Sequence, residues 1–313
     1  MIDLVDIFII LFGLIIGSFL TVCIYRIPYG REKGPGSFLD TSEEVEEGSE
    51  DLTPPDSEEI NLTTPKRSFC PNCKNQLKWY HNIPLFSWIF LRGKCAYCHA
   101  RIPFRYPLVE ILSALFCYLS FQMMPDLQTA LLIYTLCCAL IVISFIDIDY
   151  YIIPNVISIP GIWLAIIIVS ANYFFVRAHF IKTPFFAAPV AATLQEGFYG
   201  FLAGGGLLYV LAKTFVILRK KEGLGFGDVK LMSLVGILLG PEGAIYAIMV
   251  GSIFGSVFGI VQLLFQGKKL GYPLPFGPYL ALGTVLYLFT DPEIPINILH
   301  SITGSIATAI WGS

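Results

Sequence analysis

The sequence predicts an all-α polytopic membrane protein with about eight transmembrane helices and one polar insert. Of its 313 residues, 55% are hydrophobic and only 14% are charged, whereas soluble domains carry about 25% charged residues. Crossing a bilayer takes a helix of about 20 apolar residues, and runs near that length recur along the chain. The expected segments are 4–25, 107–124, 127–146, 156–176, 196–218, 229–240, 243–265 and 275–290. The sixth of them is too short to cross a bilayer alone.

The basic residues indicate how these segments are oriented. Asp3 and Asp6 precede the first apolar run, and Arg26, Arg31 and Lys33 follow it, which is not the order of a cleaved signal peptide. Because loops rich in Lys and Arg stay in the cytoplasm, we expect the N-terminus outside and the next loop inside. Eight crossings then leave 18 of the 20 Lys and Arg residues in or beside cytoplasmic segments.

Most of the polar residues lie in the insert that follows the first apolar run. Its first part, 34–65, contains no Lys or Arg and many acids. Such a composition cannot bury enough apolar surface to fold, so we expect a solvated acidic linker. The sequence therefore divides into a first transmembrane segment at 1–28, a cytoplasmic insert at 29–106 (linker 34–65, cysteine module 66–106), a transmembrane core at 107–290 and a tail at 291–313.

The cysteine module contains two CxxC pairs separated by 21 residues, Cys70-Pro-Asn-Cys73 and Cys95-Ala-Tyr-Cys98. Four thiolates from two tight turns suit tetrahedral zinc. The alternatives are two disulfides or four free thiols, and the reducing cytoplasm disfavours disulfides. A closed four-sulfur site leaves no position for a substrate, so we expect a structural zinc-binding insert. The nearby His81 and His99 are expected at the surface.

Two acids lie where apolar runs meet the cytoplasm, and we expect them to act as a pair. Charge at the edge of lipid is costly and usually functional. Asp147 and Asp149 are two residues apart, so a helix would point them about 200° apart and they cannot share a proton. The candidate partner at matching depth is Asp228. Two adjacent carboxyls hold one proton between them, so that one activates water and the other assists the carbonyl of a peptide bond.

Glycines precede Asp228 at every second position, at Gly223, Gly225 and Gly227. Without side chains, this stretch would let an extended substrate backbone approach the carboxylate closely. The alternative is a flexible turn with an incidental acid. We expect Asp149 to be solvated in the turn after Asp147, and Glu110 to be a structural hydrogen-bond partner rather than part of a second site.

These motifs occur in the order found in the type IV prepilin peptidase family, which the chain resembles over nearly its whole length. The similar strings are Gly17–Pro28, the two CxxC pairs, Arg105–Glu110, Ile146–Pro154, Glu222–Lys230 and Pro275–Tyr279. Thr21 departs from the family's first-span signature, which commonly has Asn there.

The resemblance implies roles for individual residues. Asp147 and Asp228 match the family's catalytic aspartates, the four CxxC cysteines match its zinc ligands, and Gly93 and Lys94 match a step linked to methylation. The implied substrates are prepilins and type II secretion pseudopilins, cut after a Gly that ends a short basic leader, at the cytoplasmic face. The new N-terminus would be methylated from S-adenosylmethionine. The resemblance also implies the bacterial inner membrane, with lipid and pilin subunits as partners and no nucleic acid.

Two other classes of protein share part of the pattern. A GxGD protease that cuts within transmembrane helices would share the string that ends at Asp228, but not the zinc insert or the first-span signature. A zinc-binding scaffold or transporter would use the aspartates to carry ions or brace helices. Transporters usually show internal repeats, and none is evident here.

Overall fold

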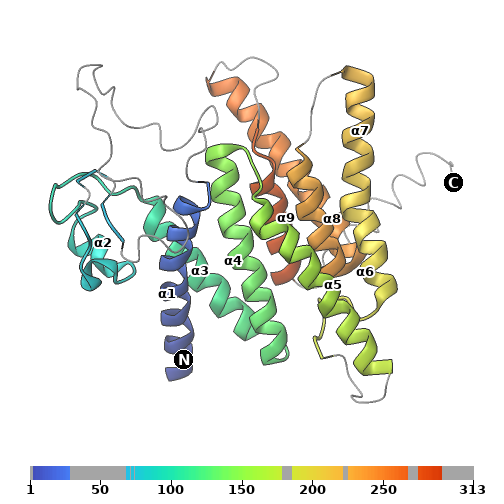
Figure 1. Cartoon of the computed structure of the whole chain (residues 1–313), viewed down its shortest axis with the longest axis horizontal. Helices are drawn as coiled ribbons and strands as arrows, with labels where there is room; N and C mark the ends of the chain where they lie inside the picture. Colours follow the sequence, from blue (N-terminus) through green and yellow to red (C-terminus); the bar gives the residue numbers. More distant parts are fainter. Residues whose placement is uncertain are drawn as a thin grey trace. The chain divides into compact units, whose positions relative to one another are not determined.

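The computed structural model describes residues 3–28, 68–70, 72–73, 75–177, 185–220, 225–266 and 274–290. Within these ranges the chain is helical, with two isolated β-bridges and no β-strand. The helices are α1 Leu4–Arg26, η1 Trp79–Asn82, α2 Phe86–Phe90, α3 Arg105–Met123, α4 Leu127–Tyr150, α5 Asn155–Arg177, α6 Leu194–Phe201, η2 Leu202–Gly206, α7 Leu207–Arg219, α8 Phe226–Gln266 and α9 Gly277–Phe289 (Figure 1).

The all-α membrane fold is confirmed, but the number of eight crossings is not. In the described part of the chain, six helices are long and apolar enough to cross a membrane, if α6, η2 and α7 are taken as one. Helix α9 is a shorter apolar helix of 13 residues. The difference also involves α8, whose 41 residues contain both the sixth and the seventh expected segments. The predicted acidic linker and the C-terminal tail lie outside the described residues.

The chain forms two compact units. The first contains the described residues of 1–121 and 136–151, and the second those of 122–135 and 152–313. Helix α4 begins in the second unit and ends in the first.

In the first unit, α1 packs closely on α3 through two glycines spaced four residues apart. A Cβ at Gly13 would lie 2.6 Å from the Ala114 Cα, and one at Gly17 would lie 2.6 Å from the Glu110 Cα. The Ser113 hydroxyl donates to the Gly13 carbonyl across the contact, at 2.8 Å. Small residues at this spacing let helix backbones approach in lipid, where there is no hydrophobic driving force.

The first half of α8 is the core of the second unit. Residues 231–240 are all buried, with α5, α6, η2 and α9 packed against this helix. A helix that is apolar on every side is normally buried on every side. Protein, rather than lipid, therefore surrounds the segment that seemed too short to cross a bilayer.

Helix α8 breaks where two expected segments meet. Gly240 has φ 74° and ψ −178°, which is not helical, and Pro241 follows it. Only glycine adopts this backbone conformation readily, and proline cannot donate a backbone hydrogen bond. The predicted boundary between the sixth and seventh segments is therefore a real interruption of the helix.

Glycines also bring α6 and η2 against α8. A Cβ at Gly200 would lie 1.8 Å from the Gly236 carbonyl oxygen, and one at Gly204 would lie 2.2 Å from that of Met232. Helices α6, η2 and α7 follow one another as one nearly continuous column (Figure 1). The segment η2 is a π-helical turn, which is wider than an α-helix, and it lies where Gly204 contacts the α8 backbone.

We predict that Gly17→Val destabilises the first unit, because its new side chain would meet the α3 backbone. Overpacking of this kind costs about 1–3 kcal/mol. The matched control is Gly259→Ala in α8, where the nearest heavy atom to a new Cβ is 3.8 Å away. Thermal unfolding in detergent should show a lower melting temperature for Gly17→Val only. Equal melting temperatures for the two variants would contradict this packing.

Candidate functional site

The four cysteines are presented by two loops with the same hydrogen bonding. The Cys70 N–H donates to the Asn75 carbonyl, and the Cys95 N–H donates to the Ala100 carbonyl. Each loop is closed by an isolated antiparallel bridge, Phe69 with Gln76 and Lys94 with Arg101. The two CxxC turns therefore adopt one backbone arrangement twice.

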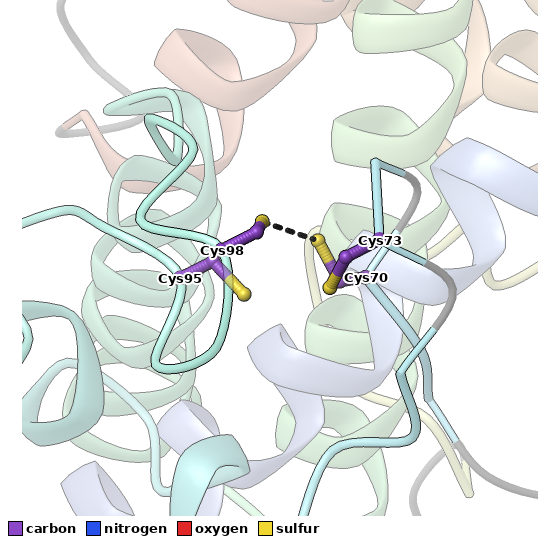
Figure 2. A group of neighbouring side chains, drawn as sticks. All are labelled: Cys70, Cys73, Cys95 and Cys98. Carbon is purple, nitrogen blue, oxygen red and sulfur yellow. Dashed lines mark hydrogen bonds between the residues drawn. The ribbon is translucent and has the colours of Figure 1, made fainter.

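The two loops bring all four sulfur atoms together (Figure 2). All four lie within 4.8 Å of one another, and the sulfurs of Cys70 and Cys98 are 3.9 Å apart. Tetrahedral zinc with bonds of about 2.3 Å places its sulfur ligands about 3.8 Å apart. Cys70, Cys73, Cys95 and Cys98 therefore fit the predicted zinc site. In the described residues neither His81 nor His99 belongs to the cluster.

The protonation of these thiols also suits a metal. Hydrogen bonding from the Ala100 backbone lowers the pKa of Cys98 to about 7, so this ligand ionises readily at neutral pH. The Asn72 amide also donates to the Cys98 sulfur, at 3.7 Å. Burial raises the pKa of Cys70 to about 11, and a bound cation would lower it.

Gly93, which precedes the third cysteine, is required by the fold. Its φ of +67° favours glycine, and a Cβ there would lie 3.1 Å from the Trp88 ring. The Gly93 N–H donates to the Trp88 carbonyl, and its own carbonyl accepts from Ile102. Lys94 is exposed. Backbone conformation and packing therefore account for Gly93. The link of Gly93 and Lys94 to methylation stays a prediction.

Asp147 lies in the last turn of α4, in the first unit, and is buried. The Tyr151 N–H donates to the Asp147 carbonyl, which closes the end of the helix. Tyr151 has a φ of +56°, so the chain turns sharply at this point. The predicted acid therefore lies at the junction of an apolar helix and a turn.

Asp149 was expected to be solvated, and this expectation is wrong. It is 1% exposed, and its carboxylate forms a buried ion pair with the Arg105 guanidinium. Arg105 also donates to the Phe145 carbonyl at 2.8 Å and lies over the Phe145 ring. The ion pair was not predicted because Arg105 is 44 residues away from Asp149 in the sequence. It could have been suspected from Arg105 itself, a cation at the start of an apolar run on the expected cytoplasmic side.

Asp228 lies in the first turn of α8, in the second unit, and is 7% exposed. Its N–H donates to the Gly225 carbonyl. The positive end of the helix dipole favours negative charge at this position. The Lys230 ammonium, two residues later, donates to the Asn155 side chain at 2.7 Å.

The glycines before Asp228 have different roles. A Cβ at Gly225 would lie 3.3 Å from the Asp228 carboxylate, so this glycine keeps a side chain away from the acid on that side. A Cβ at Gly227 would lie 2.7 Å from that of Ile153, so this glycine permits packing. Gly223 lies outside the described residues. Substrate access stays a prediction for Gly225, whereas packing accounts for Gly227.

Glu110 makes a structural hydrogen bond, as expected, and this bond does not exclude the alternative of a second site. Its carboxylate accepts from the Leu85 N–H at 2.8 Å, which ties α3 to the start of α2. Leu85 has a φ of 59° and needs such support. A large cavity lies beside this carboxylate, and it could not be predicted because its walls come from segments far apart in the chain.

The structure therefore assembles the four cysteines, and it places Asp147 and Asp228 in separate units. Their pairing remains a prediction. The fold and these residues define a class: a multi-pass membrane protein with a four-cysteine cluster that could hold a metal ion and with buried acids at helix ends.

Comparison with known proteins agrees with that class. Residues 11–124 match the Bacterial Peptidase A24 N-terminal domain, and residues 134–260 match the Type IV leader peptidase family. A Stutzerimonas stutzeri protein named "Prepilin leader peptidase/N-methyltransferase" is 34% identical over 92% of this chain and 91% of its own. Proteins of the same name from Aeromonas salmonicida (strain A449) and Pseudomonas aeruginosa are 33% and 32% identical, each over 89% or more of both chains. No solved structure matches. The chain belongs to the type IV leader peptidase family.

We predict that Cys73→Ser lowers bound zinc well below one ion per chain and destabilises the insert, because three thiolates cannot complete the site. Elemental analysis of the purified protein measures the metal. Cys23→Ser is the control, since Cys23 is outside the cluster and should leave the zinc content unchanged. Equal zinc content in wild type and Cys73→Ser would contradict the predicted zinc site.

We also predict that Asp149→Asn destabilises the protein by about 3–5 kcal/mol, because it leaves the Arg105 charge buried without its partner. The double variant Arg105→Met/Asp149→Leu removes both charges and should be more stable than Asp149→Asn. Thermal unfolding in detergent compares them. A single variant as stable as wild type would show that the ion pair contributes little.

Proposed function

We propose that this chain is a membrane-embedded aspartic endopeptidase that removes the short basic leader of type IV prepilins and pseudopilins and then N-methylates the new N-terminus. The observation that carries this proposal is the similarity over about 90% of both chains to proteins named for these two activities. Cleavage would follow the Gly that ends the leader, and S-adenosylmethionine would supply the methyl group.

The proposed peptidase chemistry uses Asp147 and Asp228 as a pair. One carboxylate removes a proton from water, and the water oxygen attacks the scissile carbonyl. The other, protonated, donates to the carbonyl oxygen and later protonates the leaving amine. Such carboxyls titrate as a pair, so neither has a fixed role as the base. Both acids are buried, and low surrounding polarity strengthens their coupling.

Local backbone supports a role for each acid. Asp147 is held in the last turn of α4, where Arg105 contacts residues on both sides of it, Phe145 and Asp149. Asp228 is held in the first turn of α8, with no side chain at Gly225 to cover it. An extended peptide could therefore approach Asp228 from the side of Gly225.

The metal has a structural part in this proposal. Zinc held by Cys70, Cys73, Cys95 and Cys98 would keep the two loops together, and a closed set of four ligands leaves no position for water or substrate. The proposed location is the bacterial inner membrane, with the N-terminus outside and both the zinc module and the acids on the cytoplasmic side. The excess of Lys and Arg in the expected inside segments supports this orientation.

We predict that Asp147→Asn and Asp228→Asn each reduce cleavage of a purified prepilin by about 10²–10⁴-fold or more, because either amide prevents proton transfer. Asp126→Asn is the matched control. Asp126 accepts from the Thr129 N–H and hydroxyl at the other end of α4, and asparagine caps a helix equally well. Full activity in either test variant would exclude the aspartate pair.

Mass spectrometry of the mature pilin tests the second activity. One added methyl group on the new N-terminus is expected with wild type and S-adenosylmethionine. An unmodified amine after complete cleavage would limit the proposal to the peptidase.

A further inference from the structure

The first unit contains a cavity of about 800 Å³ between α1, the cysteine module and the start of α3. Residues from all three segments line it, including Cys70 and Cys95 of the metal site. Small-molecule sites usually measure about 300–1,000 Å³ and combine an apolar wall with a few polar groups. The cavity has the size of a site for one nucleoside-sized ligand.

The wall is rich in aromatic side chains, among them Phe19, Tyr25, Phe69 and Trp88. The Trp88 indole is held in place, since its N–H donates to the Ile102 carbonyl at 3.2 Å and its ring lies against Gly93. Aromatic faces bind flat heterocycles by stacking, and they attract cations through the ring quadrupole. The wall is therefore suited to an adenine ring, to an onium cation or to both.

Glu110 is the acidic residue of this cavity wall within the described residues. It is 8% exposed, and one of its carboxylate oxygens accepts from the Leu85 N–H. A buried carboxylate in an apolar wall has strong electrostatic preference for a cation. Gly17 places the α1 backbone against the Glu110 Cα, and the Leu85 N–H holds the carboxylate itself.

Two arginines also line the cavity. Arg26 comes from the last turn of α1, and Arg101 from the second cysteine loop. Arginine binds carboxylates well, through paired N–H donors. The cavity wall thus has one carboxylate, two guanidinium groups and the imidazole of His81 beside its aromatic side chains.

This distribution of charge selects among possible occupants. A lipid acyl chain would fill the apolar wall but would give the Glu110 carboxylate no cationic partner. A peptide N-terminus carries one cation and no aromatic base. S-adenosylmethionine carries a flat adenine, a sulfonium cation, an ammonium group and a carboxylate, which correspond to the aromatic, acidic and basic parts of the wall.

We propose that this cavity binds S-adenosylmethionine, with the Glu110 carboxylate beside its sulfonium cation. The inference rests on the proposed function, because an N-methylating enzyme needs a methyl donor. In the transfer, the N-terminal ammonium of the pilin first loses a proton to solvent. Its nitrogen lone pair then forms the N–C bond, the C–S bond breaks, and the electron pair of that bond remains on sulfur as a neutral thioether.

The four-cysteine cluster and the cavity share two residues. Because Cys70 and Cys95 belong to the cavity wall, losing the metal should disturb the binding site. Thr21 also lines the cavity, and its hydroxyl donates to the Ser18 carbonyl at 2.7 Å.

The test measures binding to the full-length protein in detergent, by calorimetry, with S-adenosylmethionine and its neutral thioether product S-adenosylhomocysteine. Glu110→Gln keeps the size of the side chain and an oxygen that can accept from Leu85, but removes the charge. It should weaken binding of S-adenosylmethionine about tenfold or more, and binding of S-adenosylhomocysteine by less than about twofold.

Glu196→Gln is the matched control. Glu196 is an exposed glutamate in α6 of the second unit that accepts from the Ala192 N–H. It should bind both compounds as wild type does. Zinc content checks that each variant retains the folded module. Unchanged affinity for S-adenosylmethionine in a zinc-replete Glu110→Gln protein would overturn the proposal.

Photolabelling of the wild-type protein gives an independent result that needs no variant. Ultraviolet irradiation with S-adenosylmethionine that carries tritium in its methyl group should attach label to peptides from 4–26 or 81–110. Label confined to the second unit, or a lipid in this cavity that S-adenosylmethionine does not displace, would overturn the site.

Asp147→Asn separates this inference from the proposed function. The variant should lose leader cleavage yet bind S-adenosylmethionine with wild-type affinity. Wild-type protein that methylates pilin while Glu110→Gln binds the donor normally would refute the cavity and leave the proposed function intact. Wild-type protein that neither methylates nor binds the donor would refute the inference together with the methyltransferase half of the proposal.

Discussion

The buried ion pair between Arg105 and Asp149 is the interaction on which the rest of the first unit depends. An isolated charge inside an apolar bundle is costly, and pairing offsets most of that cost. Arg105 begins α3, at the end of the cysteine module, and Asp149 lies in the last turn of α4. The pair therefore fixes the end of α4 relative to the segment that follows the four-cysteine cluster. Because Arg105 also holds the Phe145 carbonyl, the backbone on both sides of Asp147 is fixed.

Close backbone packing provides the second constraint. Helices in lipid gain little from burying apolar side chains, so they associate by shape and by hydrogen bonds. Gly13 and Gly17 bring α1 onto α3, and Gly200 and Gly204 bring α6 and η2 onto α8. The first contact also positions Glu110 in the wall of the large cavity. The second surrounds the helix that carries Asp228.

Local patterns in the sequence were enough to predict the long apolar helices, the boundary near Gly240 and the cysteine cluster, but not the number of crossings. Apolar runs mark helices that cross lipid, and paired CxxC turns carry their own geometry. The position of Asp149 could not be predicted, because its partner is distant in sequence and nothing in the local turn distinguishes a solvated acid from a paired one. The cavity was missed for the same reason, since three separate segments line it. The roles of Gly225 and Gly227 looked alike in the sequence, and only the position of Ile153 distinguishes them.

The central claim is that Asp147 and Asp228 meet at one water molecule. Cross-linking tests it most directly, with Asp147→Cys and Asp228→Cys combined in a chain whose Cys23, Cys117, Cys137 and Cys138 are replaced by serine. The claim predicts that the two new thiols form a disulfide, or react with a short bifunctional reagent, in the membrane-embedded protein. Failure to cross-link with any spacer up to about 10 Å, with or without bound prepilin, would contradict it, since two carboxyls that share a proton lie about 3 Å apart.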